Sequence, residues 1–237
     1  MKDLFGKAMF DFQTNNSPEN IITETSISEE DEMSVDYLFR SYNEMPKIEQ
    51  KALQLANGKI LDVGCGAGSH SLSLQNDRNL NVTSIDISEK AIATCKLRGV
   101  KNARVQNLLD LEEEKFDTIV LLMNGVGIFG KMENCNNYLS KLKSLLNPGG
   151  QILLDSSDII YMFDEDEDED GGKWIPSSGD YYGELVFTIS YKGEKEEPFN
   201  WLYLDYNTLQ NAAVANGLKC ELILEGEHYD YLARLCI

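Results

Sequence analysis

Three glycines at alternate positions follow a short apolar run. This spacing is the feature of the sequence that most directly indicates ligand binding. The segment is Ile60-Leu61-Asp62-Val63-Gly64-Cys65-Gly66-Ala67-Gly68-Ser69-His70. The apolar run predicts a buried strand, and the residues after Gly68 predict the start of a helix. Glycine accepts backbone angles closed to other residues and lets main-chain N–H groups approach a ligand closely. The segment therefore predicts a ligand held against the backbone.

A carboxylate, Asp86, ends the next apolar run. At this place a carboxylate can accept hydrogen bonds from both hydroxyls of a ribose, which predicts a ligand of the adenosine type. The dinucleotide fingerprint is GxGxxG, but here the third glycine comes one residue early and Ser69 takes the sixth place. This spacing disfavours NAD, and a nicotinamide oxidoreductase stays the second hypothesis.

The stretch from Asp62 to Gly68 resembles the first motif of class I S-adenosylmethionine-dependent methyltransferases, and Asp86 stands at their ribose-binding acidic position. The resemblance extends from about residue 59 to residue 237. Leu146-Asn147-Pro148-Gly149-Gly150 is similar to the turn that follows a helix in that family. The resemblance implies S-adenosylmethionine as the cofactor and methyl transfer as the activity.

Two further positions follow from the resemblance. Asn107 occupies the place after the third strand that meets the adenine amine, where the family usually has aspartate. Leu122-Met123-Asn124-Gly125 maps onto the end of the fourth strand, beside the reactive sulfonium. Cys65 has no evident histidine partner, which favours a small residue packed under the cofactor over a nucleophile. The implied cofactor-binding residues are Asp62, Gly64, Cys65, Gly66, Gly68, Asp86, Ile87, Asn107, Leu108, Met123 and Asn124.

Methyl transfer from a sulfonium is an in-line displacement, so the main task of the enzyme is to align the acceptor atom, the methyl carbon and the sulfur. An oxygen or protonated nitrogen acceptor must also lose a proton. His228, Glu227, Tyr181 and Tyr182 are candidates for the base by chemical type alone, so the catalytic residues stay unassigned. The acceptor is expected to be a small molecule, and a protein acceptor stays open.

Residues 1–56 are expected to form a helical extension or lid before the cofactor-binding domain, which spans residues 57–237. Arg40 is a candidate partner of the cofactor's carboxylate, and Tyr37 and Tyr42 are candidates to close over the acceptor. A plain amphipathic helix is the favoured explanation of these residues. His70 is expected to cap or pack the helix after the glycines.

The elements that must position these residues alternate between strands and helices. Apolar runs predict strands at 60–63, 82–85, 118–123 and 152–154, and helical patterns cover 47–55, 89–98, 135–146 and 206–216. Strands separated by helices imply a parallel sheet, while the short link between predicted strands 219–224 and 231–237 permits only antiparallel pairing. The prediction is an α/β, three-layer Rossmann-like methyltransferase fold with a seven-stranded, mostly parallel sheet and an antiparallel last strand.

An insertion over about residues 160–200 is expected after the fifth strand, with a β-ribbon over residues 182–191. Its aromatic residues Tyr181, Tyr182, Phe187 and Tyr191 are compatible with a substrate wall, a homodimer contact or plain sheet packing.

An acidic run over residues 164–170 begins this insertion. Asp166, Asp168, Asp170 and Gly171 imitate the start of a calcium loop, but Ser177 stands where a bidentate glutamate is required. A solvated loop is therefore favoured, and no metal is predicted.

The charge and the cysteines narrow the class of protein. The formal net charge of −19 repels phosphate backbones and anionic membranes, so neither nucleic acid nor a membrane is an expected partner. The five cysteines form no CxxC pair, and no signal peptide or membrane span is evident, which favours the cytoplasm. A third hypothesis is a non-catalytic protein of the same fold that acts through protein contacts.

Overall fold

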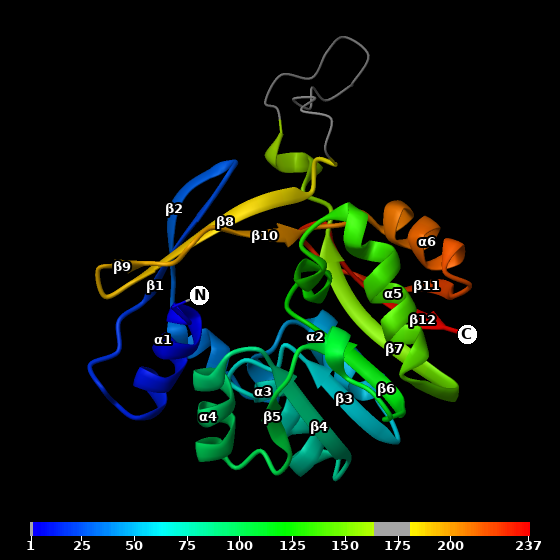
Figure 1. Ribbon diagram of the computed structural model, residues 1–237, viewed down its shortest axis with the longest axis horizontal. Coiled ribbons are helices and arrows are strands. Elements are labelled where there is room, and N and C mark those ends of the chain that lie inside the picture. Colours follow the sequence, from blue (N-terminus) through cyan, green and yellow to red (C-terminus); the bar gives the residue numbers. More distant parts are fainter. Residues whose placement is uncertain (1, 164–180) are drawn as a thin grey trace.

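The computed structural model describes residues 2–163 and 181–237, which form two β-sheets with helices packed around them (Figure 1). The main sheet has seven strands in the order β11-β12-β7-β6-β3-β4-β5. Strands β5, β4, β3, β6 and β7 are parallel, and β12 runs antiparallel to both β7 and β11. The predicted seven-stranded, mostly parallel sheet with an antiparallel last strand is confirmed. Its strands are β3 (Lys59–Val63), β4 (Asn81–Asp86), β5 (Ala103–Val105), β6 (Phe116–Leu121), β7 (Leu146–Ser157), β11 (Lys219–Glu225) and β12 (Asp230–Cys236).

Helices cover both faces of this sheet, because successive residues of its central strands point to opposite sides. On one face Leu61 and Ile119 pack with Leu139 of α5 and Leu209 of α6. On the other face Ile60 and Val120 pack with Ala52 and Leu53 of α2. The three-layer architecture follows. The helices are α1 (Leu4–Gln13), α2 (Lys47–Leu55), α3 (Ser69–Leu72), α4 (Glu89–Arg98), α5 (Cys135–Ser144) and α6 (Tyr206–Ala215).

Short helical turns complete the chain. The 3₁₀ helices are Val35–Phe39, Tyr42–Glu44, Leu108–Asp110, Gly125–Phe129, Met132–Asn134 and Ile160–Met162, and a π-helical turn over Ser73–Asp77 continues α3. None of the helices in residues 2–163 and 181–237 is long and apolar enough to cross a membrane. The calcium-like positions Asp166, Asp168, Asp170 and Gly171 lie outside the described residues.

Helix α4 has the predicted bounds because both of its ends carry local signals. The Ser88 hydroxyl accepts a hydrogen bond from Ala91 N at 2.9 Å, and Gly99 ends the helix with φ +93°. The predicted helix over 135–146 ends earlier, at Ser144. Leu146 already pairs with Phe116 in the sheet, so the Asn-Pro-Gly-Gly turn lies within the bounds of β7.

A second sheet joins the N-terminal segment to the insertion. It has the order β10-β8-β1-β2, with β9 beside β8, and all of its pairs are antiparallel. The predicted ribbon over 182–191 corresponds to β8. The strands are β1 (Ile21–Thr25), β2 (Ser28–Met33), β8 (Glu184–Tyr191), β9 (Glu194–Lys195) and β10 (Phe199–Leu202).

The prediction that residues 1–56 are helical is wrong for residues 21–33, which form the hairpin of β1 and β2. The reason is a distant partner: Ile22 pairs with Ser190 and Thr25 with Phe187 of β8. Helix α1, which agrees with the helical prediction for residues 1–56 but for which no bounds were given, packs its Leu4 and Ala8 against this sheet. It also lies against α4, so the N-terminal segment connects the second sheet to the main domain (Figure 1).

Candidate active site

The three glycines of the turn after β3 all have left-handed backbone, with φ of +69° at Gly64, +52° at Gly66 and +83° at Gly68. Their surroundings differ. A Cβ on Gly68 would meet Cys95 Sγ and Val100 Cγ2 at 2.9 Å each, so Gly68 permits close packing of the turn on α4. No described atom lies within 4 Å of a Cβ placed on Gly64, which leaves that side of the turn open.

Hydrogen bonds fix the turn to the end of β4. The N–H groups of Gly64 and Cys65 donate to Ile85 O at 2.9 and 3.1 Å. Gly66 N donates to Asp86 Oδ2 at 3.0 Å, and Ser88 N donates to Asp86 Oδ1 at 2.9 Å. Burial raises the pKa of Asp86, and these two N–H groups act against that rise. Each carboxylate oxygen keeps a further lone pair for a ligand.

The side chain of Asp62 is buried below the turn. Its Oδ2 accepts a hydrogen bond from Ser71 Oγ at 2.5 Å, and Ser71 Oγ lies 2.6 Å from Ser84 Oγ. Burial raises the pKa of Asp62. These contacts tie β3 to α3 and β4, and the cofactor contact of Asp62 stays a prediction.

Cys65 is packed inside the turn, with its Sγ 3.8 Å from Cys95 Sγ. The neighbouring Cys95 thiol and burial together raise the pKa of Cys65 well above its ordinary value. A neutral, buried thiol agrees with a packing role and not with a nucleophile.

Residues after β4 and β5 lie at the same edge of the sheet, because these strands are parallel neighbours. Ile87 is 56% exposed and Leu108 is buried. The Asn107 side chain is exposed, and its Oδ1 accepts a hydrogen bond from Leu109 N at 2.9 Å. The predicted adenine-side residues are thus near each other in the fold, and their contact with cofactor stays a prediction.

The end of β6 carries two consecutive left-handed residues that are not glycine, Met123 (φ +65°) and Asn124 (φ +55°). Such backbone costs about 1–3 kcal/mol for each residue and needs support from its surroundings. Asp155, near the end of β7, gives that support. Its Oδ2 accepts from Met123 N at 3.1 Å and its Oδ1 accepts from Gly125 N at 2.9 Å.

Asp155 was not predicted as a site residue, although it follows the predicted strand 152–154 as Asp86 follows the predicted strand 82–85. Asp155 is only 8% exposed, and burial raises its pKa to about 6.

The same turn is also tied to the second sheet. Ser156 Oγ donates to Asn124 Oδ1 at 3.1 Å, and Asn124 Nδ2 donates to Leu202 O at 3.2 Å. Ser156 Oγ in turn accepts from Leu204 N at 2.9 Å. Asn124 therefore links the ends of β6, β7 and β10.

A buried ionic cluster lies beside the glycine turn. Arg40 Nη2 contacts both carboxylate oxygens of Glu49 at 2.5 Å, and His70 Nε2 lies 2.6 Å from Glu49 Oε2. Burial tends to raise the pKa of Glu49, but His70 and Arg40 lower it overall. His70 packs against Glu49, which agrees with the packing role expected for it.

One nitrogen of Arg40, its Nε, has no partner within the described chain. Its Nη1 donates to Tyr37 O at 2.6 Å, and its guanidinium lies 4.1 Å from the centre of the Tyr37 ring. Its Nε is buried and has no hydrogen-bond partner among residues 2–163 and 181–237. An unpaired buried N–H is costly, so this donor is available to an anionic group of a ligand. Tyr42 makes a different contact: its hydroxyl accepts a hydrogen bond from Gln54 of α2.

The N-terminal segment covers the glycine turn. Met9 of α1 has its Sδ 3.7 Å from a Cβ placed on Gly66, and Ser69 Oγ donates to Leu38 O at 2.8 Å. Arg98 donates to Ala67 O at 2.7 Å and to Phe39 O at 3.2 Å. Met9 was not predicted to lie at the site, because no helical pattern had been assigned to residues 4–13.

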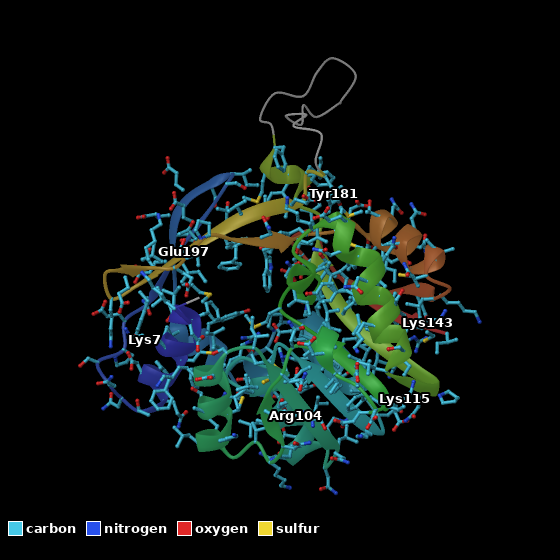
Figure 2. The ribbon with its side chains drawn as sticks, in the orientation of Figure 1. Lys7, Arg104, Lys115, Lys143, Tyr181 and Glu197 are labelled. Atoms are coloured by element: carbon cyan, nitrogen blue, oxygen red, sulfur yellow. The ribbon has the colours of Figure 1, made fainter. Side chains whose placement is uncertain are left out.

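Tyr181 and Tyr182 precede β8, and Figure 2 shows Tyr181 where the second sheet meets the α5 and α6 side of the main sheet. Tyr181 donates to Asp205 at 2.7 Å and Tyr182 to Asp158 at 2.8 Å. Burial raises the pKa of Tyr181 to about 12 and that of Tyr182 further. Both phenols are therefore protonated near neutral pH, which makes them donors and not bases.

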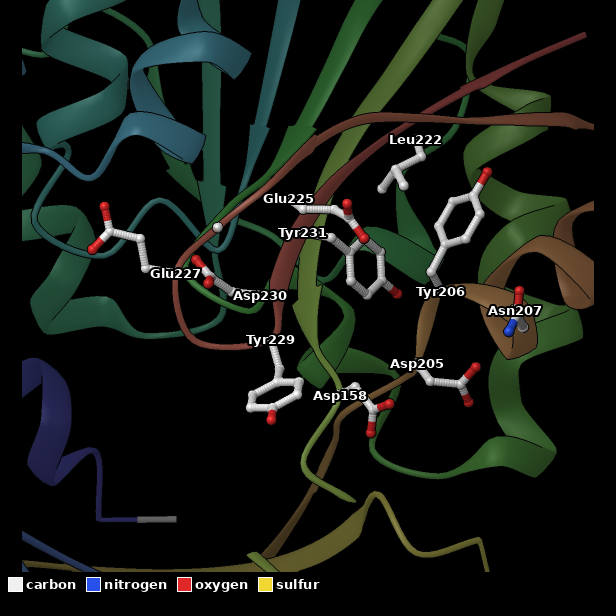
Figure 3. A pocket seen from close by; sticks show the side chains of 11 residues that line it. Asp158, Asp205, Tyr206, Asn207, Leu222, Glu225, Glu227, Tyr229, Asp230 and Tyr231 are labelled. Atoms are coloured by element: carbon white, nitrogen blue, oxygen red, sulfur yellow. The ribbon is translucent and has the colours of Figure 1, made fainter. Parts of the chain in front are cut away.

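The other base candidates lie at the surface, in the turn between β11 and β12. His228 and Glu227 are exposed, and Glu227 lies 3.8 Å from Lys47 Nζ. A cavity of about 580 Å³ opens between this turn and the start of α6 (Figure 3). None of the predicted cofactor-binding residues lines it. Its lining is Asp158, Asp205, Tyr206, Asn207, Leu222, Glu225, Gly226, Glu227, Tyr229, Asp230 and Tyr231.

An aromatic group lies on β8 and β10. The ring of Phe187 stacks with those of Phe199 and Tyr203, with centroids 6.0 and 6.4 Å apart, and Phe199 meets Trp201 edge to face at 6.3 Å. These rings are half-buried. Tyr191, by contrast, is only 1% exposed and belongs to the packing of α1 on the second sheet.

Comparison with known proteins agrees with this geometry. A family model described as a methyltransferase domain matches residues 54–204. The chain belongs to this methyltransferase family. The methyltransferase is 47% identical to an S-adenosylmethionine-dependent methyltransferase from Bacteroides fragilis, whose crystal structure contains S-adenosyl-L-homocysteine. The two structures superpose with a TM-score of 0.90 over 100% of this chain and 95% of that chain.

Two curated relatives match a shorter region. The methyltransferase is 30% identical over 112 residues to the ubiquinone biosynthesis O-methyltransferase of Dechloromonas aromatica, which covers 44% of this chain and 46% of that protein. It is 40% identical over 78 residues to the release factor glutamine methyltransferase of Flavobacterium psychrophilum, over 30% of this chain and 27% of that protein. The chain thus spans less than half the length of these relatives.

The protein is therefore an S-adenosylmethionine-dependent methyltransferase with a Rossmann-like fold, and S-adenosylmethionine is its cofactor. This result replaces the hypotheses of a nicotinamide oxidoreductase and of a non-catalytic protein of the same fold.

Proposed function

We propose that this methyltransferase transfers the methyl group to a small-molecule acceptor by in-line displacement at the carboxyl edge of β3, β4 and β6. The observation that carries the proposal is the open, left-handed main chain at Gly64, next to the ordered carboxylate of Asp86. A side chain at position 64 would fill the space beside the turn. The structure keeps that space free, which supports a ligand against the backbone.

The residues present fit S-adenosylmethionine. Main-chain groups between Gly64 and Gly68 would hold its amino-acid end, and the free Nε of Arg40 would donate to its carboxylate. Asp86 would accept from the ribose hydroxyls, and Asn107 would face the adenine. The end of β6 at Met123 would lie beside the sulfur.

When bound, S-adenosylmethionine supplies a methyl group on a cationic sulfur, which an acceptor atom displaces in line. The protein's part is alignment and the exclusion of water, and precise orientation can contribute roughly 7–11 kcal/mol to lowering the barrier. The N-terminal residues Met9 and Leu38, packed over the glycine turn, would shield the site from solvent.

A small acceptor is supported by charge and by the second sheet. The net charge of −19 disfavours nucleic acid as an acceptor. Phe187 of β8, Phe199 of β10 and Tyr203, which follows β10, provide half-buried rings that could bind an apolar or planar part of a small molecule. The names of the two curated relatives include both a small-molecule pathway and a protein substrate, so a match to the core leaves the acceptor to experiment.

The test has two stages. Calorimetry with S-adenosylhomocysteine should show binding by the wild type, and Gly64→Val, which fills the open side of the turn, should weaken it by roughly 100-fold or more. Methyl transfer from labelled S-adenosylmethionine should then be followed in two pools of acceptors, a panel of metabolites and a set of purified proteins.

Label in the metabolite pool and none in the protein pool is the expected result. Label confined to the protein pool would overturn the small-molecule acceptor while leaving the cofactor site intact. Failure of the wild type to bind S-adenosylhomocysteine would overturn the proposed cofactor site itself. Cys236→Ser, at the far end of β12, is a suitable control that should bind like the wild type.

A further inference from the structure

In the turn after β6, the main-chain N–H groups that flank a strained pair of residues of the proposed site donate to one side chain, Asp155. Met123 and Asn124 are both left-handed, and Asp155 accepts hydrogen bonds from the N–H groups on either side of the pair, Met123 N and Gly125 N. The length of the Asp155 side chain and the register between β6 and β7 determine these two hydrogen bonds, because Asp155 comes from the neighbouring strand β7.

We propose that Asp155 is a positioning residue for methyl transfer, which holds Met123 and Asn124 in the backbone conformation that presents the end of β6 to the methyl donor. The proposal rests on the proposed function, since that assigns this turn to the sulfur of the cofactor. Asp155 acts through the turn, because each of its carboxylate oxygens accepts from a main-chain donor and the side chain is only 8% exposed.

The setting of Asp155 fits a functional and not merely a stabilising role. It is 8% exposed, and burial raises its pKa to about 6, so the charged form is held at a cost near neutral pH. The titratable groups that influence it are Glu49 of α2 and His70 of α3, and Asp155 in turn influences Tyr37 and Tyr203. A carboxylate kept ionised in such a place is consistent with a site where geometry matters more than stability.

The experiment is a double-mutant cycle read out by S-adenosylhomocysteine binding, which needs no acceptor. Asp155→Asn removes one carboxylate acceptor and places an amide N–H against a main-chain N–H, so binding should weaken roughly tenfold. Met123→Gly lets position 123 adopt the left-handed region without support. In the Met123→Gly background, Asp155→Asn should therefore weaken binding by less than roughly threefold.

Asp117→Asn is the matched control. Asp117 also lies on the main sheet and accepts a main-chain hydrogen bond, from Lys59 N at 2.7 Å, but at the opposite edge. It should leave binding within roughly twofold of the wild type, as expected for a distant site.

A second measurement does not depend on the folding of Asp155→Asn. As pH falls through about 6, protonation of Asp155 should loosen the turn and weaken S-adenosylhomocysteine binding in the wild type. This fall should be smaller in Met123→Gly, because glycine removes the strain at position 123 and leaves only Asn124 in need of support. Equal pH profiles for the two proteins would overturn the proposal.

Equal losses from Asp155→Asn in the wild-type and Met123→Gly backgrounds would also overturn it, since Asp155 would then act by another route. Either result leaves the proposed function standing so long as the wild type binds S-adenosylhomocysteine. Absence of wild-type binding would instead remove the proposed function and this inference together.

Discussion

The main sheet contributes the main chain of the glycine turn and polar side chains such as Asp86 to the proposed site, whereas the second sheet contributes aromatic side chains. At the main sheet, Gly64 and Gly66 expose left-handed backbone, and Asp86 and Asp155 hold main-chain N–H groups in place. The second sheet presents the stacked rings of β8 and β10 and has no comparable backbone strain next to them among the described residues.

This difference has a physical consequence. A site made of backbone depends on the conformation of the whole turn, so a single added atom can abolish binding. A wall made of rings can change its shape by side-chain replacement while the strands keep their ladder. We therefore expect substitutions near the main sheet to alter cofactor binding and stability, and substitutions in the second sheet to alter the choice of acceptor.

The largest effect is expected at Glu49, beside the glycine turn. Glu49→Leu leaves the buried Arg40 without its carboxylate partner, which should lower the free energy of unfolding by about 3–5 kcal/mol in urea denaturation. Glu227→Gln, which removes an exposed contact with Lys47, should cost less than about 1 kcal/mol. Similar losses from the two variants would show that the Arg40–Glu49 contact is not a buried ion pair.

The next effect concerns pH and Asp155. Its pKa is raised from its ordinary value of 3.8 to about 6, so the native state binds more protons than the unfolded state between these values. Its contribution to the free energy of unfolding is complete below about pH 4 and is lost as pH rises to about 6, by roughly 3 kcal/mol. Denaturation curves of wild type and Asp155→Asn should converge or cross over this range, and parallel pH profiles would contradict the burial of an ionised Asp155.

Substitutions at the two ends of the glycine turn should differ in effect, one lowering mainly the free energy of unfolding and the other mainly S-adenosylhomocysteine binding. Gly68→Ala meets Cys95 and Val100 at 2.9 Å and has φ +83°, so it should lower the free energy of unfolding by about 2–3 kcal/mol. Gly64→Ala has open space and should cost only about 1 kcal/mol, but it should weaken S-adenosylhomocysteine binding more strongly. Normal S-adenosylhomocysteine binding by Gly64→Ala together with a large loss in its free energy of unfolding would contradict this difference between the two glycines.

The smallest effects on stability are expected in the second sheet. Phe187→Leu should cost less than about 1.5 kcal/mol and leave S-adenosylhomocysteine binding unchanged, while the KM of an identified acceptor rises. Val186→Thr, at the neighbouring outward position that is 41% exposed, should change neither quantity beyond about 0.5 kcal/mol. A loss of cofactor affinity in Phe187→Leu would mean that the two sheets do not divide the site in this way.

Local signals in the sequence determined the core of this protein. Apolar runs followed by glycine or aspartate predicted β3, the glycine turn after it, and β4 with Asp86 at its end, and a serine cap and a terminal glycine set the bounds of α4. The short link before β12 determined the antiparallel end of the main sheet. In each case the residues that decide the structure lie within a few positions of one another.

Only the tertiary structure decided the rest, because the deciding partners are distant in the chain. Strand β2 is rich in exposed carboxylates and has no apolar alternation, so only the pairing of β1 with β8 shows that this hairpin belongs to a sheet. The contacts of Glu49 with Arg40 and His70, and of Asp155 with the turn after β6, likewise join separate elements. A carboxylate in a sequence does not name the N–H group that it will accept from, since that group is brought to it by folding.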